Sequence, residues 1–280
     1  MDKLIIGCGY LGRRIASRWC REGHHVFATT RTGQHANELR QLGLEPVICD
    51  VLNPDTLATL PAVQTVVHCV GLDRRSGQTM RAVYVQGLAN VLARLPTTNR
   101  FLYISSTSVY GQRAGELVDE TAVTEPSEES GRIVLEAEEL ARKQWPGAII
   151  LRFAGIYGPG RLLRQEAVQA GEPIVAEPER WLNLIHVDDG ATAVLAAESR
   201  SQPGAIYNVS DDHPIPRREF YAALASILGA PAPRFAPPDP CGPLPPHERA
   251  NRRISNELMR RELGVNLQYP SFREGLRASV

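Results

Sequence analysis

The chain of 280 residues is long enough for one large domain or two smaller ones with a sizeable hydrophobic core. Its hydrophobic fraction of 43% and charged fraction of 22% are typical of a soluble globular protein, and its net charge is zero. Because the chain has neither a basic run nor an apolar run near the roughly 18 residues of a membrane span, we expect no nucleic-acid or membrane partner. Five cysteines without a Cys-x-x-Cys pair indicate reduced thiols and a cytoplasmic location.

The first patterned stretch is a strand, a glycine-rich turn and a helix. Apolar residues at 4–6 predict a short buried strand, and Gly7, Gly9 and Gly12 follow it directly. Apolar residues then recur at helical spacing over 11–19. Gly-x-Gly-x-x-Gly between a strand and a helix is typical of a turn that binds the pyrophosphate of a dinucleotide on the N–H groups at the helix start. Glycines that only form a turn are the simpler alternative.

Strands and helices alternate as far as residue 152. This alternation predicts an α/β fold, a Rossmann-type doubly wound parallel sheet that binds its ligand at the carboxyl ends of the strands. The expected strands are 4–6, 25–30, 45–48, 64–70, 101–105 and 148–152. The expected helices after the first are 35–42, a segment following Asp50, 78–95 and 131–144.

The pattern changes after residue 153, where a loop rich in glycine and proline begins. We expect residues 1–160 to form the dinucleotide-binding domain, with parts of 184–209 returning to it. Residues 161–183 and 210–280 would then form a small, discontinuous C-terminal substrate lobe. The expected elements are helices near 161–170, 189–199, 217–228, 254–263 and 271–278, a strand at 205–209, and an irregular loop with eight prolines at 231–246.

Several motifs occur in an informative order along nearly the whole chain. They are Val66-Val-His-Cys-Val-Gly71, Ser105-Ser-Thr-Ser-Val-Tyr-Gly111, Leu151-Arg-Phe-Ala-Gly-Ile-Tyr-Gly-Pro-Gly160, Leu184-Ile-His-Val-Asp-Asp189, Ile206-Tyr-Asn-Val209 and Arg261-Glu-Leu-Gly264. Together with the glycine turn, they make the chain resemble the extended short-chain dehydrogenase/reductase family, the nucleotide-sugar epimerases and dehydratases.

The resemblance implies a nicotinamide-dinucleotide site and a small-molecule substrate. The implied cofactor residues are Gly7, Gly9, Tyr10, Leu11 and Gly12 at the pyrophosphate, Asp50 and Val51 at the adenine, Val70 and Gly71 along the nucleotide groove, and Ser105, Phe153 and Ile156 at the nicotinamide. Ser106 would donate a hydrogen bond to the reacting oxygen of the substrate. Its alternative role is only to end the strand, as for Ser108.

The end of the second strand bears on the choice between NADP and NAD. An NAD site usually places an acid there to hold the ribose 2′-hydroxyl, but this chain has no Asp or Glu between Gly23 and Asn37. Arg31 occupies the place and offers donors to a 2′-phosphate. NADP is therefore the preferred cofactor over NAD. A solvated arginine is the alternative, since only two of the 31 basic residues are lysines.

The catalytic pair of the family is missing. Its members use Tyr-x-x-x-Lys on the helix after the fifth strand, where the lysine lowers the pKa of the tyrosine so that it can act as a general base. Ser130 and Val134 stand at these positions, and none of the eight tyrosines has a lysine four residues later. Ser130 is thus a candidate hydrogen-bond donor in the active site or, alternatively, a helix N-cap. The chain resembles the atypical members of the superfamily.

Two further positions depart from the family's substrate-binding pattern. Gly155 replaces a frequent asparagine, and Leu182 replaces an arginine that often grips a nucleotide diphosphate. His186 with Asp188 and Asp189 does not have the spacing of metal ligands, so we expect no metal.

Two hypotheses remain open at this point. The chain is either an NAD(P)-dependent oxidoreductase or epimerase-like enzyme for a small sugar-derived or carbonyl substrate, or a non-catalytic NADP(H)-binding redox sensor or regulator. The resemblance also implies a possible homodimer through the helices at 78–95 and 130–144.

Overall fold

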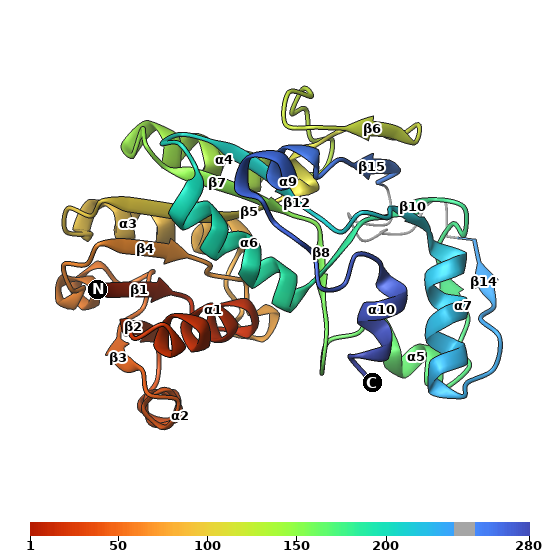
Figure 1. The fold of residues 1–280 in the computed structure, drawn as a ribbon, viewed down its shortest axis with the longest axis horizontal. Helices are drawn as coiled ribbons and strands as arrows, with labels where there is room; N and C mark the ends of the chain where they lie inside the picture. Colours follow the sequence, from red (N-terminus) through yellow and green to blue (C-terminus); the bar gives the residue numbers. More distant parts are fainter. Residues whose placement is uncertain (238–249) are drawn as a thin grey trace.

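A seven-stranded parallel sheet forms the centre of the computed structural model, which describes residues 1–237 and 250–280. Its strand order is β12-β7-β5-β4-β1-β2-β3, so the order reverses between β1 and β4 as in a doubly wound sheet (Figure 1). The predicted Rossmann-type fold is confirmed. The strands are β1 (Asp2–Ile6), β2 (His25–Thr30), β3 (Glu45–Ile48), β4 (Thr65–His68), β5 (Arg100–Ser106), β7 (Ile149–Phe153) and β12 (Ile206–Val209).

Helices cover both faces of the sheet because successive strand side chains point to opposite sides. Ile5 packs in the core beneath α1 (Tyr10–Arg21) and α6 (Val187–Arg200). Its neighbours Leu4 and Ile6 pack in a second core with α3 (Gly87–Arg94) and α4 (Glu129–Gln144). The short α2 (Gly33–Gln41) lies beside β3.

Two predicted helices of this half differ from the structure. The segment after Asp50 forms only a 3₁₀ turn, η1 (Pro54–Thr59), in which the Thr56 hydroxyl donates to the carbonyl of Asn53 and competes with a longer helix. The helix expected at 78–95 contains a π-helical stretch, η3 (Ala82–Gln86), before α3 begins. The strand expected at 64–70 ends at His68, where the chain turns to line the cleft described below.

The second half of the chain builds a smaller lobe with its own hydrophobic core. Its helices are α5 (Gln165–Gln169), α7 (Arg217–Leu228) and α10 (Phe272–Arg277), while α9 (Glu257–Leu263) packs against α6. Short strand pairs outside the central sheet complete the fold. They are β6 (Glu116–Val118) with β15 (Arg252–Ile254), β8 (Gly155–Tyr157) with β11 (Leu184–His186), β9 (Ile174–Val175) with β14 (Phe235–Ala236), and β10 (Trp181–Leu182) with β13 (Ile215–Pro216).

Two predicted helices of the lobe are shorter than expected. Helix α5 begins only at Gln165, because Arg161 bridges back to Gly158 and Arg164 adopts a left-handed backbone with a φ of 52°. Helix α9 begins at Glu257, since the residues before it form β15 against β6. Residues 238–246 of the expected proline-rich loop lie outside the described residues. No helix among the residues described is long and apolar enough to cross a bilayer.

Candidate active site at the carboxyl ends of the strands

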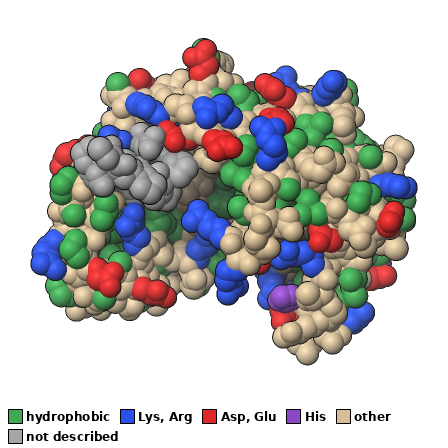
Figure 2. All heavy atoms as spheres, turned by 180° about the vertical axis from the view of Figure 1, so that it is seen from behind, with side chains coloured by type: hydrophobic (Ala, Val, Ile, Leu, Met, Phe, Trp, Pro, Cys, Tyr) green, Lys and Arg blue, Asp and Glu red, His purple; other side chains and the backbone are tan. Residues whose placement is uncertain are grey.

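A cleft of about 1430 Å³ runs along the carboxyl ends of the central strands. Figure 2 shows the surface hollowed between the sheet-containing part and the C-terminal lobe, with hydrophobic side chains inside the hollow and basic side chains near its rim. This is the edge at which the sheet order reverses, the usual ligand position in such folds.

The glycine turn forms one wall of the cleft, and close packing requires two of its three glycines, Gly7 and Gly12. Gly7 has a φ of 89°, and a Cβ there would lie 2.7 Å from the backbone of Val70. Gly9 faces open space and provides no side chain to cap α1, so the first N–H groups of this helix stay available to an anion. Gly12 lies behind the turn, where a Cβ would be 2.9 Å from the Gly7 carbonyl oxygen. It therefore brings helix and strand together and does not line the cleft.

The structure brings most of the predicted cofactor residues to this one cleft. Those on its wall are Gly7, Gly9, Tyr10, Leu11, Arg31, Asp50, Val51, Val70, Gly71, Ser105, Phe153 and Ile156, together with the predicted substrate residue Ser106. They come from the ends of different strands and lie together only because the strands are parallel and adjacent.

Charged side chains gather at the end of the cleft formed by the loops after β2 and β4. Arg31 Nη2 lies 3.4 Å from Asp73 Oδ2, and Arg75 Nε lies 3.8 Å from Asp73 Oδ1. Thr32 and His35 line the same end, where the Thr32 hydroxyl accepts a hydrogen bond from the His35 amide at 3.3 Å. Sequence reasoning found Arg31 but missed Asp73 and Arg75, because no motif links the two loops.

A buried polar network lies directly beneath the opposite end of the cleft. The Ser105 hydroxyl donates to Glu138 Oε1 at 2.5 Å, and Arg152 donates to both oxygens of Glu138. Glu138 and Arg152 are only 2% and 4% exposed. Burial alone would lower the pKa of Arg152, but its hydrogen bonds and ion pair with Glu138 raise it, so the guanidinium stays charged. Arg152 also donates to the Tyr110 hydroxyl at 2.9 Å.

Sequence reasoning did not find this network. Glu138 was only one of several acids on the helix at 131–144, and Arg152 ended an apolar strand. A charged residue at the end of an otherwise apolar strand was the available signal, since such a side chain needs a buried partner. The network holds Ser105 in place on the cleft wall, because the hydroxyl proton of Ser105 is donated to Glu138. Toward a group in the cleft, the hydroxyl oxygen of Ser105 can therefore act only as a hydrogen-bond acceptor.

The two positions of the missing catalytic pair are placed differently. Val134 lines the cleft and is 6% exposed, so the cleft wall is apolar at the position where the resemblance predicts the family's lysine. Ser130 is the second residue of α4, half-buried and not on the cleft wall. It is not the N-cap either, because Glu128 occupies that position. No lysine is among the residues that the structure places around this cleft.

Ser106 both lines the cleft and caps the turn after its strand. It lies on the cleft wall, and its hydroxyl oxygen accepts the Ser108 amide at 3.1 Å, which caps the turn η4 (Thr107–Val109). The hydroxyl proton remains available to a group in the cleft, because the cap uses only a lone pair. Tyr110 does not line the cleft, and its hydroxyl donates to Asn208 Oδ1 at 2.8 Å.

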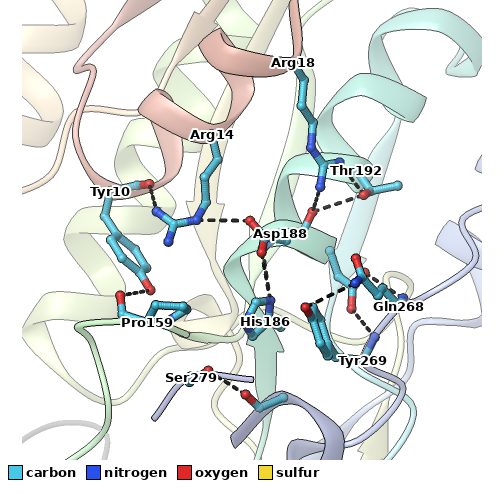
Figure 3. A network of polar contacts seen from close by, with 12 residues as sticks. Tyr10, Arg14, Arg18, Pro159, His186, Asp188, Thr192, Gln268, Tyr269 and Ser279 are labelled. Atoms are coloured by element: carbon cyan, nitrogen blue, oxygen red, sulfur yellow. Dashed lines mark hydrogen bonds and ion pairs between the residues drawn. The ribbon is translucent and has the colours of Figure 1, made fainter. Parts of the chain in front are cut away.

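A further network ties α1 to α6 beside the cleft (Figure 3). Arg14 Nε lies 3.1 Å from Asp188 Oδ1, and Arg18 donates to the Asp188 carbonyl at 2.8 Å. The Asp188 amide donates to His186 Nδ1, and burial lowers the pKa of His186. The Tyr10 hydroxyl donates to the Pro159 carbonyl at 3.0 Å and so joins the glycine turn to the loop after β8. Arg14, Arg18 and Asp188 thus hold α1 against α6 beside the cleft.

Comparison with known proteins agrees with this architecture. The NAD dependent epimerase/dehydratase family matches residues 4–210. The chain belongs to this family. The predicted resemblance to the epimerase/dehydratase family is therefore confirmed.

Relatives of the NAD dependent epimerase/dehydratase family match almost the whole chain. The protein YeeZ of Escherichia coli strain K12 is 30% identical over 284 residues, which cover 95% of each chain. The 3-diazoavenalumate denitrifying reductase of a Streptomyces species is 28% identical over 309 residues, which cover 99% of each chain. A solved structure of a conserved protein of unknown function from Silicibacter pomeroyi superposes with a TM-score of 0.82 at 30% identity, covering 99% of this chain and 97% of that one.

Proposed function

We propose that the protein is an NADP(H)-dependent oxidoreductase that acts on a small carbonyl or sugar-derived substrate. The observation that carries this proposal is the convergence of a dinucleotide-type glycine turn, Arg31 and Ser105–Ser106 on one cleft. The family is described as NAD dependent, and a relative that matches 99% of the chain is named a reductase.

The residues present fit a dinucleotide. Gly7 lies close to Val70, and no side chain caps the start of α1. A pyrophosphate bound there would accept hydrogen bonds from the backbone N–H groups at the start of the helix. Arg31 would hold the 2′-phosphate, and Asp50 with Val51 would border the adenine. Ser105, Phe153 and Ile156 would border the nicotinamide, which supplies or accepts a hydride when bound.

Ser106 is the residue of this chain placed to act on the substrate. Its free hydroxyl proton would donate to the substrate carbonyl oxygen and stabilise the charge that develops there during reduction. Ser106 cannot replace the missing tyrosine as a proton source with a lowered pKa, and no lysine on the described cleft wall would assist it. We therefore infer that water delivers the final proton, and that turnover is slow compared with members that have the pair.

Val134 and Ser130 favour a second function, that of a non-catalytic NADP(H)-binding redox sensor or regulator. An apolar residue in place of the lysine suits a protein that binds NADP(H) without turnover and reports its occupancy to a partner. A small-molecule substrate belongs to the first proposal only. Cytoplasmic location and a homodimer through 78–95 and 130–144 stay predictions under both.

The first prediction tests the cofactor. Purified protein should bind NADPH more tightly than NADH, and Arg31→Ala should weaken NADPH binding by about tenfold or more, because a charge-assisted bond to a phosphate is lost. NADH binding should change little. Titrations that follow nicotinamide fluorescence measure both affinities.

The matched control is Arg74→Ala, because Arg74 lies beside this cleft end but does not line the cleft. Equal affinities for NADPH and NADH in the natural protein would show that Arg31 does not select the cofactor. Binding of neither dinucleotide would contradict both proposed functions.

A further inference from the structure

The contact between Arg31 and Asp73 joins two loops that face each other across the cleft. Arg31 follows β2 and Asp73 follows β4, and both line the cleft at the end proposed for the adenosine. The chain has no acid at the usual position after its second strand. Asp73 brings a carboxylate to the same end from a different loop.

The Asp73 carboxylate is held in place by its own loop. Asp73 Oδ1 accepts the Arg75 amide at 3.0 Å, and the Asp73 carbonyl oxygen accepts the Ser76 amide at 2.9 Å. Gly77, with a φ of 70°, ends this short 3₁₀ turn, η2 (Arg74–Ser76). The carboxylate therefore keeps its position whichever way the arginine side chain points.

The Arg31 side chain is bound more loosely than the carboxylate. It is 54% exposed, and its single contact with Asp73 is long, at 3.4 Å. Ion pairs between side chains this exposed contribute little stability, so a more strongly charged anion can displace Asp73 and bind the Arg31 guanidinium. Arg31 is thus free to turn toward a phosphate, while Asp73 stays nearby.

The two side chains act in opposite directions on a ribose 2′-phosphate. A phosphate monoester carries a charge of about −1.5 to −2 near neutrality, which attracts Arg31 and is repelled by a fixed carboxylate. The 2′-hydroxyl of NAD(H) is neutral and can donate a hydrogen bond to a carboxylate. The sign of the Asp73 effect therefore differs between the two cofactors.

We propose that Asp73 is a specificity-determining residue that opposes the 2′-phosphate and limits the preference for NADP(H) that Arg31 creates. This inference rests on the proposed function, since it assumes that the adenosine 2′ position lies at this end of the cleft. Cofactor selection would then depend on two loops, the loop after β2 that carries Arg31 and the loop after β4 that carries Asp73.

The test compares NADPH and NADH affinities of the natural protein, Asp73→Asn and Asp73→Ser by fluorescence titration. Both variants keep an acceptor for the Arg75 amide, so the turn should persist. We expect tighter NADPH binding, by roughly twofold to tenfold, and unchanged or weaker NADH binding. The gain should shrink at high ionic strength, because the repulsion acts between exposed charges.

Asp55→Asn is the control, because it removes one negative charge from an exposed side chain outside the cleft. An unchanged NADPH-to-NADH ratio in both Asp73 variants would overturn the proposal. So would a lower ratio, which would mean that Asp73 holds Arg31 in its binding position, or an equal gain in Asp55→Asn, which would indicate net charge alone.

The outcomes separate this inference from the proposed function. If Arg31→Ala weakens NADPH binding but the Asp73 variants do not alter the ratio, only the role of Asp73 is wrong. If the natural protein binds neither dinucleotide, or if Arg31→Ala does not change the affinity for NADPH, the proposed cofactor site is wrong. The proposed role of Asp73 is then wrong as well.

Discussion

Asp211 is a buried carboxyl whose environment does not satisfy a full negative charge. It is 1% exposed, and its Oδ1 accepts the amide of His213 at 3.2 Å. Its Oδ2 has no hydrogen-bond partner in the described part of the chain. Burial raises the pKa of Asp211 well above its ordinary value, and the nearby carboxylates of Asp212, Asp189 and Glu274 raise it further. The folded protein therefore holds the Asp211 proton to a higher pH than the unfolded chain does.

This residue should make stability depend on pH. Below the unfolded pKa of about 3.9, Asp211 is protonated in both states and contributes no pH dependence. Above it, the unfolded chain releases the proton first, so the free energy of unfolding falls as pH rises toward the raised folded pKa. Asp211→Asn should remove this part of the fall, as measured by denaturant unfolding between pH 4 and 8. If the free energy of unfolding falls equally with pH in Asp211→Asn and in the natural protein, this role of Asp211 is wrong. Asp55→Asn, at an exposed carboxylate, is the control.

At the residue scale, the sequence predicted backbone roles better than charge pairs. The position of Gly7 followed from the motif, since only glycine suits its positive φ and its close approach to the backbone of Val70. The pairs Arg31–Asp73 and Glu138–Arg152 were not predicted, because each joins residues from separate elements. Their partners depend on loop packing that no local pattern encodes.

Helix α4 carries Ser130 and Val134, the two positions at which the sequence predicts a departure from the family's catalytic pair. Its first turn is held close to the loop after β5, since a Cβ at Gly131 would lie 2.4 Å from the Ser108 carbonyl oxygen. Positions 130 and 134 are one helical turn apart and share a face. Of these two positions, only Val134 lines the cleft.

Restoring the pair on α4 discriminates between the two proposed functions. Ser130→Tyr with Val134→Lys should raise NADPH-dependent reduction of a panel of aldehydes and ketones by about a hundredfold, because general acid catalysis is regained. NADPH absorbance measures the rate. Each single substitution is a control and should gain little. A folded double variant that binds NADPH but stays inactive would favour the sensor.

At the scale of the whole molecule, the cleft lies between the sheet and the C-terminal lobe, and the network of Arg14, Arg18 and Asp188 holds α1 against α6 beside it. A ligand that binds only the folded protein stabilises it by mass action, by about 2.7 kcal/mol at one hundred times its Kd. NADPH at that concentration should raise the Tm by roughly 5 °C or more. A thermal melt measures the shift.

The control for this shift is Arg31→Ala at the same NADPH concentration, in which the rise in Tm should be smaller. NADH at the same concentration should also give a smaller rise in the natural protein. Equal shifts with both cofactors would contradict the preference for NADP(H), while leaving binding to the glycine turn supported.

By itself, the sequence determined the alternation of strands and helices, the glycine turn and the edge of the sheet where the cleft lies. Each depends on local periodicity or on backbone conformations that few residue types adopt. Only the tertiary structure decided that Ser130 and Gly12 lie off the cleft wall, and that Asp73 and Glu138 pair with distant arginines. These contacts join residues remote in the chain, so they arise from how the elements pack and not from any pattern within one element.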